Sequence, residues 1–254
     1  MKLAITRQVS RSIADCELTY LARETIDLPR ARAQHSAYEA ALHDLGLAVL
    51  SLPEEPSLPD AVFVEDTALV LDECAIILRP GANSRRPETK SVAQVLGRFR
   101  SLHRIQPPAQ VDGGDILCLG RRVYVGLSQR SNSHAAAQLH ELLAPLGYTV
   151  HAIPVAGCLH LKSAATQIGP DSVLINPAWI DPDCFHGVRS IAVDPSEPWA
   201  ANSLLVGETV LFGADFPRTR RLLDRAGILT KELRVDELAK AEGALTCCSL
   251  IFSL

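Results

Sequence analysis

Two adjacent cysteines, Cys247 and Cys248, lie in the apolar C-terminal stretch GALTCCSLIFSL (243–254). Such a stretch predicts a β-strand, in which successive side chains point to opposite faces. One thiol would then pack in the core while the other faces a site. A cysteine thiolate is a strong nucleophile, so we expect covalent chemistry at the second thiol if other reactive groups surround it. Without such groups, a buried cysteine is more often inert packing.

Reactive side chains also gather at four other short corners of the chain. They are carboxylates, one histidine and one amide: Asp60, Glu65, Asp66, Asp112, Asp115, His160 and Asn202. A thiol, an acid–base group and several carboxylates are the set expected for covalent thiol chemistry on a cationic substrate. We therefore interpret Cys247 as the reactive thiol and Cys248 as part of the packed interior.

Each corner has a plainer interpretation when it is taken alone. PDAVFVEDT and DGGD are compatible with ordinary turns that carry solvated acids, and His160 with a hydrogen-bonded strand histidine. Arg85 and Arg130 are compatible with surface positions near helix starts. Their joint occurrence at equivalent positions of a repeated plan favours the functional interpretation.

The repeated plan is strand, strand, helix, strand. After VEDT (64–67) come the apolar run ALVLDECAIILRP, Arg85 and the stretch PETKSVAQVLGRF. Apolar residues at 92, 95, 96 and 99 follow one helix face, and Pro87 suits a first helical turn. After DGGD (112–115), ILCLGRRVYVG predicts two strands, Arg130 precedes a predicted helix that ends at Gly147, and YTVHAIPV predicts a third strand.

Three further copies complete the plan. The clear copy is AANSLLVGETVLFG, followed by PRTRRLLDRAG and ILTKELRV. The weaker copy is KSAATQIGPDSVLINP. The last copy is split between the two ends of the chain, with CCSLIF at the C-terminus and MKLAITR at the N-terminus. The corners lie near residues 66, 115, 163, 202 and 248, a period of about 40–50 residues. Five such units predict a closed, propeller-like α/β ring whose corners converge on the axis. An open mixed α/β sheet is the alternative, and the regular corners favour the ring.

Composition narrows the class of function. The chain has 254 residues, 47% of them hydrophobic, and a formal net charge of −4 without runs of like charge. We therefore expect neither a nucleic-acid partner nor a membrane partner, and no apolar stretch reaches the ~18 residues of a membrane helix. The first residues do not resemble a signal peptide, and the seven cysteines form no paired framework, so we expect reduced thiols and a cytoplasmic location. Zinc-site, dinucleotide and Walker motifs are absent, and we expect no cofactor.

Six motifs together resemble those of one family: LPDAVFVEDTALV, RPGANSRRPET, VDGGDILCLGRRVYVG, CLHLKS, AAN and LTCCS. They are similar to the motifs of dimethylarginine dimethylaminohydrolases, which belong to the pentein (amidinotransferase-like) superfamily. The motifs occur in family order from about Leu18 to the C-terminus. The resemblance implies a five-bladed ββαβ propeller, here a single catalytic domain over residues 1–254, in agreement with the repeat count.

The resemblance also implies a role for each matching residue. Cys247 matches the nucleophile and His160 the acid–base group, while two carboxylates, Asp66 and Asp112, surround the guanidinium. The substrate-binding positions are Asp60, Glu65, Asp66, Arg85 and Arg130, with backbone carbonyls from Leu18 and Ala241. The chain departs from relatives at Asp112, where some have Glu, at Glu242, where Asp or Gly is frequent, and at Ser203, where some have cysteine. Asp112 and Glu242 affect the expected substrate preference.

The implied reaction is hydrolysis of dimethylarginine or monomethylarginine to citrulline and an alkylamine. Cys247 would form a thiouronium intermediate, and His160 would first protonate the leaving amine and then activate water. The partner is thus a small guanidino amino acid, and no metal or organic cofactor has a role. Zinc is expected only as an inhibitor that Cys247 and His160 capture. The oligomeric state stays open, with a homodimer among the options.

Two other classes of function remain. Arginine deiminase, agmatine deiminase and amidinotransferase are further guanidine-modifying penteins, but the chain is shorter than typical arginine deiminases and lacks a recognisable extra helical domain. The second class is a non-catalytic propeller, such as the ribosome anti-association factor of this fold. That class predicts an incomplete Cys–His–carboxylate set, whereas the set is complete here.

Overall fold

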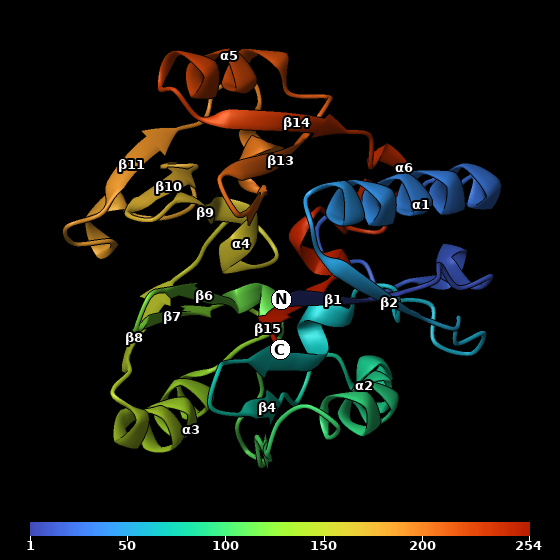
Figure 1. The fold of residues 1–254 in the computed structure, drawn as a ribbon, viewed down its shortest axis with the longest axis vertical. Helices are drawn as coiled ribbons and strands as arrows, with labels where there is room; N and C mark the ends of the chain where they lie inside the picture. Colours follow the sequence, from blue (N-terminus) through green and yellow to red (C-terminus); the bar gives the residue numbers. More distant parts are fainter.

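Five small sheets are arranged as a ring in the computed structural model, which describes residues 1–254 (Figure 1). Each sheet has three strands and forms one blade. In blade order the strands are β3 (Ala68–Val70), β4 (Ala75–Ile77) and β5 (Leu102–Arg104); β6 (Ile116–Leu119), β7 (Arg122–Leu127) and β8 (Thr149–Pro154); β9 (Ala165–Gly169), β10 (Ser172–Ile175) and β11 (Arg189–Ala192); β12 (Leu204–Val206), β13 (Thr209–Gly213) and β14 (Leu229–Leu233); and β15 (Leu250–Ser253), β1 (Lys2–Arg7) and β2 (Ala48–Leu52). The predicted five-bladed propeller is confirmed.

Every blade pairs its first two strands antiparallel and its last two parallel. A parallel pair needs a long crossover connection, which a helix usually supplies. Four crossovers contain one: α1 (Leu28–Asp44), α2 (Thr89–Leu96), α3 (Ser133–Leu143) and α5 (Pro217–Arg225). The side chain of Asn132 caps α3 by accepting from Ala135 N, and Gly147, with φ 81°, ends the short 3-10 turn that follows.

The blade of β9, β10 and β11 departs from the ββαβ plan. Its crossover contains only the 3-10 turn Pro182–Cys184. Pro177, Pro182 and Gly187 interrupt this short connection, and proline in a helix interior removes a hydrogen bond and clashes with the preceding turn. The weaker copy in the sequence is thus the blade without a crossover helix.

The hydrophobic core is divided into five clusters that lie between neighbouring blades. The largest joins α1 to β13 and to the C-terminal segment, and it contains Tyr38, Leu211 and Cys248. Another joins β3 and β4 to β6, β7 and α3. None of the helices has the length and apolar character needed to cross a membrane.

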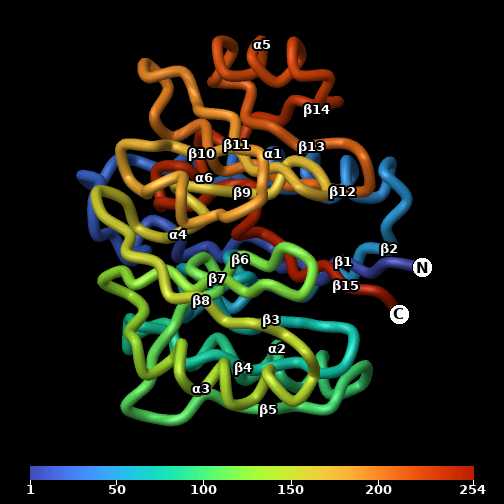
Figure 2. Tube along the Cα trace, turned by 90° about the vertical axis from the view of Figure 1, so that its left-hand side faces the viewer, coloured from blue at the N-terminus to red at the C-terminus, as the bar shows by residue number.

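The two ends of the chain close the ring. Strand β15 pairs antiparallel with β1, with Lys2 opposite Ser253 and Ile5 opposite Leu250. Leu254 N donates to Met1 O at 2.9 Å, so the termini are neighbours, as Figure 2 shows. The predicted split blade is confirmed.

A short helix stands at the head of each blade, at the five predicted corners: Val64–Thr67, Gly113–Asp115, α4 (Leu161–Ala164), Pro198–Ala201 and Thr246–Cys248. The turn Val64–Thr67 contacts the turns Gly113–Asp115 and Thr246–Cys248. Helix α4 contacts the turns Gly113–Asp115 and Pro198–Ala201. Asn202 closes the circle because its side chain bonds both Thr246 Oγ1 and Thr246 N at 3.1 Å. The corners therefore meet, as the repeat spacing predicts.

Two local predictions were wrong. Cys247 and Cys248 lie in a 3-10 turn that precedes β15, not in a strand, so strand alternation does not separate them. Pro87 lies in the 3-10 turn Asn83–Glu88 and not in the first turn of α2. In both places the chain must turn sharply to bring a site residue, Cys247 or Arg85, to the middle of the ring.

Candidate active site

The heads of the blades enclose a small cavity of about 10 Å³. Most of the predicted site residues line it: Asp60, Asp66, Arg85, Arg130, His160, Ala241 and Cys247, together with Glu17, Phe63, Leu159, Glu242 and Gly243. Three predicted residues do not. Asp112 bonds His160 of the lining, Glu65 bonds Lys162 and Thr246, and Leu18 is half-buried against the core cluster of α1.

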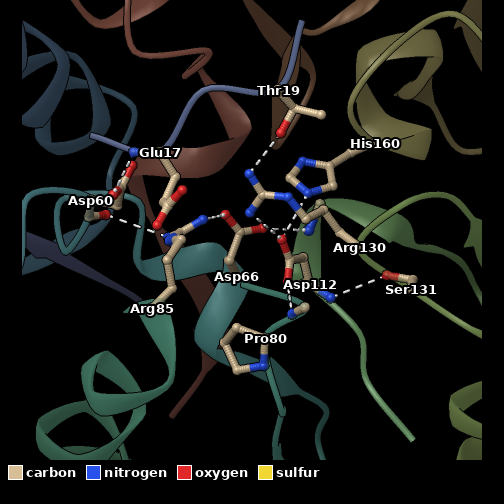
Figure 3. A network of polar contacts seen from close by, with 12 residues as sticks. Glu17, Thr19, Asp60, Asp66, Pro80, Arg85, Asp112, Arg130, Ser131 and His160 are labelled. Carbon is tan, nitrogen blue, oxygen red and sulfur yellow. Dashed lines mark hydrogen bonds and ion pairs between the residues drawn. The ribbon is translucent and has the colours of Figure 1, made fainter. Parts of the chain in front are cut away.

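His160 is held in a fixed position beside three carboxylates. It precedes α4, and its Nε2 lies 3.0 Å from Asp112 Oδ2 (Figure 3). On its other side, Gly114 N donates to Asp66 Oδ1 at 2.9 Å. A Cβ on Gly114 would lie 2.6 Å from His160 Nδ1, closer than atoms can approach. The DGGD corner is thus a close approach of backbone to imidazole and not an ordinary hairpin turn.

These carboxylates charge the imidazole. Burial disfavours the imidazolium, but Asp66, the hydrogen bond to Asp112 and Asp115 outweigh it and raise the pKa of His160 to about 9. Asp66 is buried too, and burial alone would raise its pKa. Arg85 and His160 reverse that effect and lower the pKa of Asp66 to about 2. At neutral pH, His160 is therefore a cation that can donate a proton.

Asp115 helps to hold His160 in place. It is buried and accepts from Ser128, Ser131 and the backbone of Leu161 at 2.6–2.8 Å. Burial raises the pKa of Asp115 to about 6, although His160 and the two hydroxyls oppose the rise. Through Leu161 N, Asp115 fixes the start of α4 and hence the residue before it, His160.

Cys247 carries a buried thiol whose pKa is raised. Burial, followed by the charges of Glu65 and Asp66, raises the pKa of Cys247 to about 12. Its neighbour Cys248 does not line the cavity, and its Sγ lies 3.5 Å from Ala244 O within the core. Both thiols belong to the core cluster of α1, but only Cys247 also lines the cavity, and the turn rather than a strand separates the two side chains.

Arg85 and Arg130 are buried, so the interpretation as surface residues is wrong. Arg85 Nη1 donates to Asp66 Oδ2 at 2.6 Å, and its Nε and Nη2 donate to the two oxygens of Glu88 at 3.1 and 2.9 Å. Arg130 Nη2 donates to Thr19 Oγ1 at 2.9 Å, and its Nη1 lies 3.5 Å from Asp112 Oδ2 (Figure 3). Each arginine is thus paired with an acid of the site.

Glu65 and Lys162 form an ion pair next to the site. Lys162 Nζ donates to Glu65 Oε1 at 2.6 Å, and Thr246 Oγ1 donates to Glu65 Oε2 at 2.8 Å. On the other side of this pair lies a cavity of about 220 Å³ lined by the first strands of all five blades. Lys162 and Glu88 were not predicted as site residues. Two features of the sequence could have indicated them. Lys162 lies in the motif CLHLKS, and Glu88 follows Arg85 by three residues, which is about one helical turn.

Asp66, Asp112 and His160 offer oxygen and nitrogen atoms within 4.8 Å of one another, a spacing that a metal ion can use. Arg85 and Arg130 already neutralise the two carboxylates, so the set is satisfied without a metal. Cys247 is not part of this group. Zinc capture by Cys247 and His160 stays a prediction.

Comparisons with known proteins point to one family. The sequence model described as "N,N dimethylarginine dimethylhydrolase, eukaryotic" matches residues 18–184. The N(G),N(G)-dimethylarginine dimethylaminohydrolase of Streptomyces coelicolor is 38% identical, over 98% of this chain and 96% of the relative. A cysteine-to-serine variant of the Pseudomonas aeruginosa enzyme, solved with citrulline, has a TM-score of 0.94 at 34% identity, over 98% of both chains. A histidine-to-glycine variant, solved as an adduct with S-methyl-L-thiocitrulline, also has a TM-score of 0.94 at 34% identity, over 98% of this chain and 99% of that one.

Proposed function

This chain belongs to the dimethylarginine dimethylaminohydrolase family, and we propose that it hydrolyses Nω-methylated arginines to citrulline and an alkylamine, with Cys247 as the nucleophile. The observation that carries the proposal is the meeting of Cys247, His160 and paired carboxylates in one buried cavity. The citrulline complex and the thiocitrulline adduct of the relatives support the same substrate class.

The charge pairs of the cavity suit a zwitterionic substrate. Asp66 is bonded by Arg85, and Arg130 lies beside Asp112. A substrate with a guanidinium at one end and a carboxylate at the other offers a partner to both members of each pair. Its guanidinium would meet Asp66 and Asp112, and its carboxylate would meet Arg85 and Arg130 with the bidentate geometry that arginine favours.

Substrate binding also activates the thiol. The charges of Glu65 and Asp66 help to hold the pKa of Cys247 at about 12, and the cationic guanidinium offsets them. The thiol then loses its proton to solvent, and the thiolate attacks the central guanidinium carbon from about 3–3.5 Å. A C–S bond forms in a tetrahedral adduct.

His160 handles both later proton transfers. With its pKa at about 9, it enters as an imidazolium and protonates the departing amine while the C–N bond breaks. The resulting thiouronium stays attached to Cys247. Neutral His160 then takes a proton from water as the water oxygen attacks the same carbon. The C–S bond breaks, and the proton of the added hydroxyl passes to the departing sulfur, which releases citrulline and restores the thiol of Cys247 and the imidazolium of His160. The cycle balances without a metal or an organic cofactor.

A panel of guanidines tests this function. Citrulline formation from dimethylarginine is measured beside turnover of arginine and of agmatine, which lacks the carboxylate. Charge-assisted hydrogen bonds are worth ~1.5–3 kcal/mol each, and ~1.4 kcal/mol already gives a factor of ten. We expect kcat/KM for dimethylarginine to exceed that for agmatine at least about tenfold. A higher kcat/KM for arginine or agmatine would assign the chain to the deiminases instead.

The two neighbouring thiols provide a matched pair of variants. Cys247→Ser should keep its fold and lose turnover by about 10³-fold or more, whereas Cys248→Ser should keep most of it. Mass spectrometry of quenched turnover should find the adduct on the peptide of Cys247. Loss of activity in a folded Cys248→Ser protein, with Cys247→Ser still active, would show that the wrong thiol has been chosen.

A further inference from the structure

A segment without helix or strand lies over the catalytic cavity. Residues 17–21, the lid segment, follow the 3-10 turn Ile13–Asp15, and Glu17 lines the cavity. Thr19 reaches Arg130 from above (Figure 3). Leu18 packs against the core cluster of α1, whereas Tyr20 and Leu21 are 39% and 38% exposed. The part of the segment after Leu18 therefore depends on polar contacts for its position.

The carboxylate of Glu242 supplies three of those contacts, beside the bond from Arg130 to Thr19 and the bond from Glu17 N to Asp60 Oδ2 at 3.1 Å. Glu242 Oε2 accepts from Thr19 N at 2.9 Å, and Oε1 accepts from Tyr20 N at 2.5 Å and Leu21 N at 2.7 Å. Three successive backbone amides thus converge on one anion, as in the amide concavities that bind anions elsewhere.

Glu242 also adopts a backbone conformation that glycine would favour. Its φ is 57°, and it is the one residue other than glycine with a positive φ. Side chains other than Gly, Asn and Asp rarely adopt this region because Cβ comes too close to the backbone. A glutamate at this position is therefore unfavourable locally, which points to a gain from its side chain.

The position of Glu242 connects the lid segment to the catalytic residues. Glu242, Gly243 and Leu159 line both the catalytic cavity and a neighbouring cavity of about 290 Å³, whose wall includes Tyr20 and Leu21. The catalytic cavity, at about 10 Å³, has room for roughly one water molecule. An amino acid can reach Cys247 only if this wall moves, and release of the lid segment from Glu242 would join the two cavities.

From this geometry we propose that Glu242 is a positioning residue that fastens the lid segment over bound substrate. It acts through Thr19, whose hydroxyl accepts from Arg130, and so fixes the group expected to bind the substrate carboxylate. The expected kinetic effect rests on the proposed function. The contact between Glu242 and the three amides is independent of that function.

Two substitutions separate this role from a structural one. Glu242→Gly removes the carboxylate and relieves the positive φ, so the melting temperature should stay equal or rise. Glu242→Gln keeps the shape but replaces one acceptor oxygen by a donor. In both variants we expect hydrogen exchange at the amides of residues 19–21 to speed up at least about tenfold, a modest figure for three charge-assisted bonds. KM for dimethylarginine should rise by a similar factor, with kcat changed less.

Glu208→Gln removes one exposed carboxylate from the turn between β12 and β13 and should leave exchange and KM unchanged. Glu242→Asp keeps the charge with a shorter reach and should recover part of the loss. Unchanged exchange at residues 19–21 in Glu242→Gly would overturn the proposal, as would a fall in melting temperature that accounts for the whole loss of activity. If the unaltered protein does not turn over dimethylarginine, exchange still decides the role of Glu242.

Discussion

At the scale of single residues, Cys247 and His160 are both protonated at neutral pH in the unliganded protein. The pKa of the thiol is raised to about 12 and that of the imidazole to about 9. Burial keeps the thiol unreactive, and the charges of Glu65 and Asp66, which suit a cationic substrate, add to this effect. This arrangement makes reactivity depend on the substrate, which limits oxidation and alkylation of the resting thiol.

The pH dependence of alkylation tests this view. Because only the thiolate reacts and deprotonation increases with pH, the rate at which iodoacetamide modifies Cys247 should rise through pH 9 without a plateau. The rate is followed by mass spectrometry of the peptide that contains Cys247, since the chain has seven cysteines. A plateau below pH 8 would show that the resting thiol has an ordinary or lowered pKa.

The sequence predicted which residues would meet, but not how they are paired. Cys247, His160 and Asp66 could be identified because each stands at a corner of the repeat. The partners of Glu65 and Thr19 could not, since Lys162 lies 97 residues from Glu65 and Glu242 lies 223 residues from Thr19. Such pairs depend on the angles at which the blades meet, which local patterns do not encode.

At the scale of elements, the short helices at the blade heads decide the geometry of the site. The sequence predicted their positions as corners but did not predict that they are 3-10 turns or short helices. Strand alternation was therefore wrong for the two cysteines, because they lie in one of these turns. Apolar spacing predicted α2, whereas α1, the longest crossover helix, was not predicted from the sequence. The blade of β9–β11 differs because prolines and glycine replace its helix.

The corner Gly113–Asp115 provides a test at this scale. In Gly114→Ala, the new Cβ would lie 2.6 Å from His160 Nδ1 and 3.2 Å from Asp66 Oδ1, so the imidazole must move from its place. We expect kcat/KM to fall about 10²-fold or more, since small misplacements of catalytic groups have effects of this size.

Gly97→Ala is the matched control for that substitution. Gly97 ends α2 with φ −61°, and a Cβ there meets no atom closer than 3.3 Å. Melting temperature and activity should both stay close to those of the unaltered protein. Equal activity of the two variants would mean that the imidazole tolerates displacement and that the close approach at Gly114 is incidental.

At the scale of the whole molecule, the fold is a ring whose core lies between blades. The number of blades and the split blade were predictable because the period of the corners is visible in the sequence. The cavities were not, since they depend on side chains from all five blades. Each blade buries its apolar faces against two neighbours, so removal of one blade would expose two clusters at once.

Closure by the termini makes the ring testable by circular permutation. Leu254 N and Met1 O are 2.9 Å apart, so a short Gly-Ser linker can join them, with new ends opened at the exposed turn Gly207–Glu208. The permutant should fold and keep kcat/KM within about threefold, because exposed turns tolerate such ends. Opening the chain instead inside the buried strand β7 should abolish folding, as judged by circular dichroism, and a folded β7 permutant would contradict the ring as the cooperative unit.

The pairing of β1 with β15 also sets an order in time. During translation β1 leaves the ribosome before its antiparallel partner β15, which follows after about 10–50 s. Until then one edge of β1 is unpaired and Cys247 has not been joined to its blade. A nascent chain that ends before β15 therefore has not brought Cys247 to its blade, and we expect activity only after this segment has been made.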